Sequence, residues 1–282
     1  MTAPPAATSI QAAGVPTGST TALEPDGVLL QRLRAGRANE ILFLVPGVEG
    51  DLSELATLVS ALAGPQEIYA VAPLPQDAQQ RPVHGMERMA ELMVAAIRQV
   101  QPVGPYRLGG YSFGGLAALE MAQQLRAAGE MVDALFLIEA VYDERYWPRG
   151  IWLRAMVRRT GWQLGRIVRM PPTRAIGEFG RRAGRLVQRL LRRRSAAPDR
   201  LRAQTADEAV LAPRAYAAMA GYRPRTYPGP VMLIASLVDR HFGCDTARIW
   251  AGFARRLEVR RVFGDHLTVL RDPAAAAAVA SL

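Results

Sequence analysis

The segment "YRLGGYSFGGLAALEMAQQLRAAG" (residues 106–129) decides the fold, because it reads as a strand, a tight turn and a helix in direct succession. Ser112 stands at the turn, with Gly110 two residues before it and Gly114 two residues after it. Glycines at these positions let the backbone turn sharply and leave the serine hydroxyl exposed at the edge of a sheet. The pattern predicts that Ser112 is a nucleophile. The competing interpretation is a structural serine in a turn.

The same alternation of strand and helix continues on both sides of this segment. Short apolar runs predict strands at 40–46, 67–73, 105–112, 133–140, 230–236 and 257–264. Helical spacing predicts helices at 51–63, 86–102, 113–129, 246–256 and 273–282. Strands separated by helices indicate an α/β fold with a mostly parallel, doubly wound sheet. In such sheets the active groups lie at the carboxyl ends of the strands.

A serine nucleophile needs a base to accept its proton, and the chain contains three histidines. His84 precedes a predicted helix well before the serine, and His241 lies in a polar stretch, so both are interpreted as surface residues. His266 follows the last predicted strand and precedes the last predicted helix. Because the base comes last in triads of this chain order, the sequence favours His266.

Composition limits the class of protein. The chain of 282 residues is 50% hydrophobic, which suffices for a sizeable core. Cys244 is its only cysteine, which excludes an internal disulfide and a multi-cysteine metal site and fits a reducing compartment, so we expect a cytoplasmic location. Residues 1–26 lack the features of a signal peptide and are expected to be a disordered tail or linker. The chain has no run of 18 apolar residues, so the sequence predicts no transmembrane helix.

The net charge of +10 is concentrated in one insertion. Between Arg145 and Arg202 there are 17 arginines and two acidic residues, so the rest of the chain carries a net charge of −5. Apolar residues recur among these arginines at helical spacing, and Pro171 and Pro172 divide the segment into two helical parts.

Three interpretations of this basic insertion stay open. Its arginines are simply solvated, or they meet an acidic protein or a phosphate, or they lie on an anionic membrane surface. Nucleic acid binding is disfavoured, because no groove-reading motif accompanies the charge.

Several stretches resemble the thioesterase domains that end animal fatty acid synthases, polyketide synthases and nonribosomal peptide synthetases. The matching stretches are "LFLVPGVEG" (42–50), "IRQVQPVGPYRLGGYSFGG" (97–115), "LFLIEA" (135–140) and "GDHLTVL" (264–270). The resemblance implies an α/β-hydrolase fold over residues 27–282, with a helical lid inserted at about 142–225. It also implies that the substrate is an acyl chain held as a thioester on the phosphopantetheine arm of a carrier protein.

The resemblance places the triad acid directly after the strand that follows the nucleophile helix. The family normally has Asp there, whereas this chain has Glu139, whose extra methylene demands some backbone adjustment. Asp239 is the alternative acid, because it follows the strand "VMLIAS", where most other α/β-hydrolases keep theirs. Asp265 adjoins His266 and is interpreted as a structural partner that points away from it.

An oxyanion hole in this family uses two backbone N–H groups. One belongs to Phe113, the residue after the nucleophile, and alignment of the loop "VPGVEG" makes the Val48 amide the other. The loop has Pro46-Gly47 where the family has a His-Pro pair.

The expected chemistry is acyl transfer through an acyl-Ser112 intermediate, followed by release to water or to a hydroxyl or amine. It needs no metal or redox cofactor, and we expect the carrier protein to be supplied in trans. The alternatives are a free carboxylesterase or lipase-like hydrolase, and a non-catalytic relative that binds a partner through the arginine-rich insertion.

Overall fold

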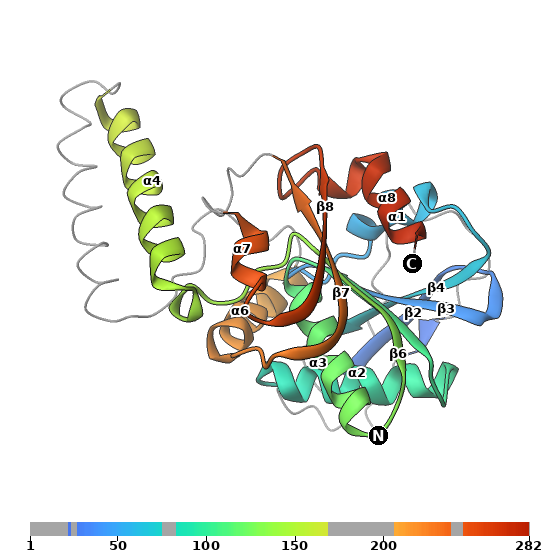
Figure 1. Ribbon diagram of the computed structural model, residues 1–282. Helices are drawn as coiled ribbons and strands as arrows, with labels where there is room; N and C mark the ends of the chain where they lie inside the picture. Colours follow the sequence, from blue (N-terminus) through green and yellow to red (C-terminus); the bar gives the residue numbers. More distant parts are fainter. Residues whose placement is uncertain (1–21, 24–26, 75–82, 169–205, 238–244, 282) are drawn as a thin grey trace, which may run out of the picture.

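The computed structural model of the protein describes residues 22–23, 27–74, 83–168, 206–237 and 245–281. Its strands form one eight-stranded sheet in the order β1-β2-β4-β3-β5-β6-β7-β8 (Figure 1). The strands are β1 Ala22–Leu23, β2 Val28–Arg34, β3 Arg37–Val45, β4 Gln66–Pro73, β5 Tyr106–Tyr111, β6 Val132–Ile138, β7 Tyr227–Ser236 and β8 Ala254–Val262. From β4 to β8 every neighbouring pair is parallel, whereas β2 pairs antiparallel with both β1 and β4. The predicted mostly parallel sheet of an α/β-hydrolase is confirmed.

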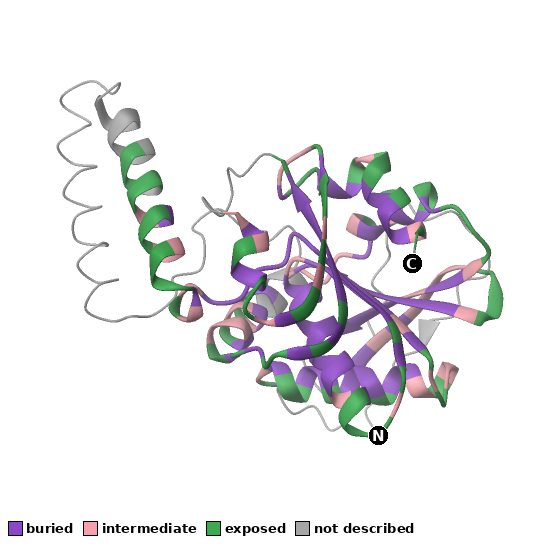
Figure 2. Cartoon of the chain, viewed as in Figure 1, coloured by how far each residue is buried: buried purple, intermediate pink, exposed green. Residues whose placement is uncertain are grey.

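Helices cover both faces of the sheet. Those of the described residues are α1 Ser53–Ala61, α2 Met86–Val100, α3 Phe113–Ala127, α4 Arg149–Val168, α6 Ala206–Gly221, α7 Thr246–Trp250 and α8 Pro273–Ala280, with short 3₁₀ turns η2 Glu144–Tyr146 and η3 Val269–Arg271. Figure 1 shows α2 and α3 below the sheet and α1 and α8 above it. Each layer has its own apolar cluster against the sheet, so the core is double-sided (Figure 2).

The central strand β3 shows why the sheet is stable. Ile41, Leu42, Phe43, Leu44 and Val45 are all buried, because consecutive side chains point to opposite faces and helices cover both. Burial of a large apolar side chain stabilises a fold by about 1.5–3 kcal/mol. This continuous apolar run holds the following loop, residues 46–50, at the carboxyl edge of the sheet.

The structure differs from the sequence prediction at three places. Strand β2 was not predicted, and β1 lies within the expected disordered tail 1–26, so that boundary is wrong by a few residues. The helix predicted at 246–256 ends at Trp250, because the chain from Ala254 pairs with β7. Residues 1–21 lie outside the described residues.

Two helices of the predicted lid, 142–225, fall within the described residues. α4 covers the first apolar-periodic stretch and extends away from the sheet (Figure 1), while α6 leads back to β7. The second helical part, predicted after Pro171 and Pro172, lies outside the described residues. No helix in the described ranges is both long enough and apolar enough to span a bilayer.

Candidate active site

Ser112 occupies a strained turn between β5 and α3. Its backbone has φ 54° and ψ −116°, in a region that L-residues with a side chain rarely adopt. Its N–H donates to the carbonyl of Ile138 at 2.8 Å, which ties the turn to the end of the neighbouring strand. Strain of about 1–3 kcal/mol persists only where surrounding contacts enforce it, and such residues cluster at functional sites.

Two glycines make this turn sterically feasible. A Cβ on Gly110 would lie 2.1 Å from the carbonyl oxygen of Gly114, and a Cβ on Gly114 would lie 2.1 Å from that of Val45. The first turn of α3 therefore packs directly on the turn and on the end of β3. This close approach explains the glycines in the sequence pattern and leaves the Ser112 side chain half-buried at the sheet edge.

Glu139 follows β6, the strand beside β5, and also has left-handed backbone, with φ 48°. Among the described residues, Ser112 and Glu139 are the non-glycine residues with positive φ. The Glu139 side chain is buried, and its Oε1 accepts the N–H of Ser236 at 2.6 Å. The main-chain N–H of Glu139 donates to Ile234 at 2.9 Å, so β7 fixes both its backbone and its carboxylate.

His266 faces this carboxylate. Its Nδ1 lies 3.6 Å from Oε2 of Glu139, within the range of an ion pair when the imidazole is protonated. The ring is buried and stacks on the Tyr111 ring, with centroids 5.2 Å apart and planes at 29°. Because Tyr111 directly precedes Ser112, these contacts place the expected base at the strand end that carries the expected nucleophile.

The turn that carries His266 is shaped by Asp265. The Asp265 carboxylate accepts the N–H groups of Leu267 and Thr268 and the Thr268 hydroxyl at 2.9–3.2 Å. The hydrogen bond from the Thr268 hydroxyl is the main reason why the pKa of Asp265 is lowered. Asp265 thus holds the loop and not the imidazole, as the sequence led us to expect.

The expected oxyanion donors lie at the same edge. β3 pairs with β5 so that Val45 is opposite Gly110, which places the loop with Val48 beside Ser112 and Phe113. Phe113 is the first residue of α3, where backbone N–H groups have no partner within the helix. This geometry can stabilise a developing negative charge close to Ser112.

Glu54 holds the loop between β3 and α1. Its Oε2 accepts the Gly47 N–H at 3.1 Å, so that amide points into the protein and is occupied. Glu54 was missed in the sequence, because a glutamate in the first turn of a helix is ordinary there and nothing in the spacing links it to Gly47.

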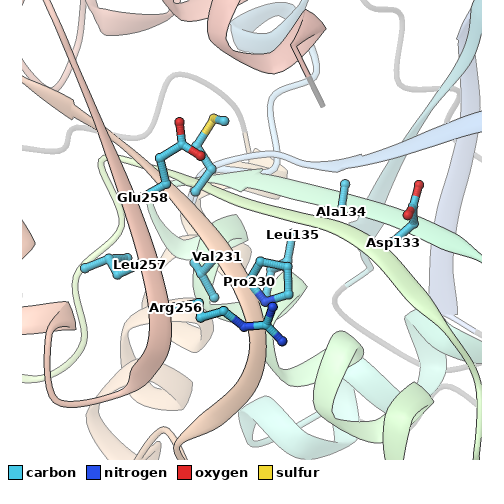
Figure 3. Close-up of a pocket in the computed structure, with 9 residues that line it drawn as sticks. Asp133, Ala134, Leu135, Pro230, Val231, Arg256, Leu257 and Glu258 are labelled. Atoms are coloured by element: carbon cyan, nitrogen blue, oxygen red, sulfur yellow. The ribbon is translucent and has the colours of Figure 1, made fainter.

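The remaining candidates lie elsewhere. His84 is exposed just before α2, as expected of a surface residue. Asp239, the alternative acid, and His241 lie outside the described residues. A cavity of about 260 Å³ on the first halves of β6, β7 and β8 is lined by Ala134, Met232 and Glu258, among others (Figure 3). Because Glu139 comes after the far end of β6, this cavity is not part of the site.

Both ends of the predicted lid segment are attached to the body of the domain. At the first end, the Tyr142 hydroxyl donates to the carbonyl of Ile249 in α7 at 2.9 Å. At the second end, the Tyr222 hydroxyl donates to the buried carboxylate of Glu120 in α3, also at 2.9 Å. The lid is therefore joined at its base to the helix that follows Ser112.

Partial burial, with a smaller contribution from the Glu49 carboxylate, raises the pKa of Tyr216 in α6 to about 12.

Comparison with known proteins agrees with this arrangement. A family model described as a thioesterase domain matches residues 40–281. Indigoidine synthase of Streptomyces lavendulae is 39% identical over 93 residues, which are 33% of this chain and 7% of that protein. The non-reducing polyketide synthase PKS16 of Cladonia grayi is 36% identical over 126 residues, 44% of this chain and 6% of that protein. The chain thus spans only a small part of the length of these relatives.

A solved structure matches over nearly its whole length. The NocB thioesterase domain, in a covalent complex with a fluorophosphonate nocardicin G analogue, has a TM-score of 0.58 and 26% sequence identity. The match covers 86% of this chain and 95% of that one. The sheet, the strained serine turn and the family match agree with one another, and the chain belongs to the family of thioesterase domains.

Proposed function

We propose that the chain is a serine-dependent thioesterase that releases an acyl, polyketide or peptidyl chain from the phosphopantetheine thioester of a carrier protein. The observation that carries the proposal is the pairing of Glu139 with His266 beside the strained turn of Ser112. A nucleophile, a base and an orienting carboxylate at one sheet edge are what acyl transfer through a serine requires.

The first half-reaction forms the acyl-enzyme. Nε2 of His266 accepts the proton of the Ser112 hydroxyl while Oγ attacks the thioester carbonyl carbon. The N–H groups of Val48 and Phe113 stabilise the oxyanion that develops. When the C–S bond breaks, the sulfur takes the proton from the imidazolium and leaves as the pantetheine thiol, and the acyl group stays on Ser112 as an ester.

In the second half-reaction His266 deprotonates a water, hydroxyl or amine, which attacks the ester carbonyl and frees Ser112. Glu139 stabilises the imidazolium in both halves and keeps Nδ1 protonated, so that Nε2 faces the serine. In this scheme the protein itself supplies no metal or redox cofactor. A carrier supplied in trans and a cytoplasmic location stay predictions.

Two further findings support the proposal. The NocB thioesterase domain forms a covalent complex with a fluorophosphonate, a reagent class that captures activated serines. The other matches, indigoidine synthase and a polyketide synthase, are much longer proteins that fit a thioesterase working within a larger synthetic assembly.

The test is intact-protein mass measurement after mixing the chain with an acyl-pantetheine thioester. We expect an acyl adduct on the parent and none on Ser112→Ala, with turnover lost in that variant. Ser60→Ala, at an exposed serine on α1, is the matched control and should behave as the parent. The proposal is wrong if Ser112→Ala keeps turnover.

A free carboxylesterase is the alternative enzyme. Comparing an acyl-carrier protein with a short nitrophenyl ester separates the two, since only a carrier-directed enzyme should have the higher kcat/KM for the carrier-bound chain. Labelling by a fluorophosphonate probe separates both enzymes from a non-catalytic relative, whose serine would stay unlabelled.

A further inference from the structure

We propose that Tyr111 is a positioning residue that fixes the position of His266 relative to Ser112. The inference rests on the proposed function and assigns a task to a side chain that the triad and the oxyanion hole do not use.

The contacts of Tyr111 reach across the fold. Its hydroxyl donates to the main-chain carbonyl of His266, a residue 155 positions later in the chain. Its ring stacks on the imidazole, with a centroid distance of 5.2 Å. One side chain thus binds both the backbone and the ring of His266, while its own backbone leads directly into Ser112.

The same ring also touches the oxyanion loop. A Cβ on Gly47 would lie 3.4 Å from Cδ1 and Cε1 of Tyr111, so the ring packs against the Cα of this glycine. Tyr111 therefore contacts the turn of the nucleophile, the loop of the base and the loop of the expected oxyanion donor Val48.

The hydroxyl is suited to a permanent donor role. Tyr111 is only 4% exposed, and burial raises its pKa above the ordinary value, with smaller contributions from the carboxylates of Glu54 and Glu139. The phenol therefore keeps its proton at pH values at which an exposed tyrosine begins to ionise, and it keeps donating to His266.

Such a restraint complements the hydrogen bonds of Asp265, which act within the loop of His266. Asp265 fixes the shape of the turn through Leu267 and Thr268, which are its immediate neighbours. These bonds cannot set the distance between the loop and β5, whereas the Tyr111 hydroxyl joins the two directly. Small displacements of a catalytic group are expensive for the rate, of the order of a hundredfold for about 1 Å.

The matched control is Tyr106 in the same strand. It is fully buried, and its hydroxyl donates to the carbonyl of Gln101 at 3.0 Å, away from the site. Tyr111→Phe and Tyr106→Phe each remove one hydroxyl that donates to a backbone carbonyl, and each leaves a buried ring in place. The Tyr106 hydroxyl also interacts with Arg98, so the main difference between the variants is which carbonyl loses its donor.

The experiment measures kcat and KM for an acyl-pantetheine thioester, together with the thermal unfolding midpoint. We expect Tyr111→Phe to lower kcat about tenfold or more while KM stays within about twofold. Tyr106→Phe should keep the kcat of the parent, although both variants unfold at lower temperature. Tyr111→Leu, which also removes the stacking, should lower kcat further.

The inference is overturned if Tyr111→Phe, once normalised to the folded fraction, keeps the kcat of the parent. Should Tyr111→Leu fail to fold, Tyr111→Phe decides the question by itself. Ser112→Ala in the same series distinguishes a failure of the proposed function from a failure of the role of Tyr111. Turnover retained there refutes the proposed function, whereas loss there with a normal Tyr111→Phe refutes only the role of Tyr111.

Discussion

The carboxylate that faces His266 belongs to Glu139, the residue that the family resemblance makes the expected triad acid. The resemblance predicts an aspartate here, and the longer side chain of the glutamate reaches within 3.6 Å of Nδ1. The Ser236 N–H binds the other oxygen, Oε1, so β7 fixes the carboxylate while Oε2 faces His266. Under the proposed function, the restraint from the neighbouring strand lets the longer glutamate take the place of an aspartate.

We therefore expect Glu139→Gln to lower kcat about a thousandfold or more, because the amide cannot stabilise the imidazolium or hold the required tautomer. Steady-state kinetics with an acyl-pantetheine thioester would measure the loss. Asp239→Asn is the matched control, since it makes the same chemical change at the other candidate acid, and it should keep kcat within about twofold. If only Asp239→Asn abolishes turnover, the acid is Asp239.

The sequence could predict the residue types of the site, because strand, glycine turn and helix follow one another within 24 residues. The roles of Tyr111 and Glu54 could not be predicted. Each acts through a contact with a main-chain atom of another segment, which no spacing in the sequence encodes. Side chains that bind backbone carry little signal in a single sequence.

Among the elements, α4 has the most unusual surface. Leu153 and Val157 are among its exposed side chains, and so are Arg149, Arg154 and Arg158. The helix contains no acidic residue, so it presents positive charge to any partner. Of the three interpretations of the basic insertion, this surface allows a direct test of the one in which arginines meet an acidic carrier.

In that interpretation Arg149→Gln combined with Arg154→Gln lowers kcat/KM for a carrier-bound substrate at low salt, since complementary charge speeds the encounter. The difference from the parent should shrink at high salt, because screening removes the attraction. Arg37→Gln, at an exposed arginine where the central strand β3 begins, is the control.

An acyl-pantetheine thioester without a carrier should react equally with all of these proteins. Equal salt dependence in the parent and the double variant would exclude a role of Arg149 and Arg154 in attracting an acidic carrier.

The elements that the sequence missed share a physical cause. β2 contains Gln and Arg among its apolar residues, and its strand conformation depends on pairing with β4. Arg34 stabilises this pairing further by donating to the carbonyls of Leu62 and Gly64. The end of the predicted helix at 246–256 becomes strand through pairing with β7. Strands at or near the edges of a sheet depend on tertiary pairing, so local periodicity is a weak guide to them.

At the scale of the whole molecule, buried tyrosines make stability depend on alkaline pH. Burial raises the pKa of Tyr111, Tyr216 and Tyr222, to about 12 for Tyr216. In the unfolded chain these phenols ionise near pH 10. Above that pH the unfolded state binds fewer protons than the folded state, so the free energy of unfolding falls as pH rises.

Urea denaturation at several pH values between 8 and 11.5 would measure this dependence. We expect a constant midpoint below about pH 9.5 and a steady fall above it, less steep in Tyr222→Phe than in the parent. A midpoint in the parent that stays level or rises up to pH 11 would contradict the prediction.

The left-handed backbone of Ser112 and Glu139 has a consequence for how this protein tolerates change. Both residues are held in conformations that glycine adopts without strain, at the two positions where the proposed chemistry forbids glycine. Selection for stability alone would favour glycine at both positions, whereas selection for turnover would favour the serine and the glutamate. Selection for stability and selection for turnover therefore oppose each other at Ser112 and Glu139. Substitutions that stabilise the fold without loss of turnover are expected at other positions.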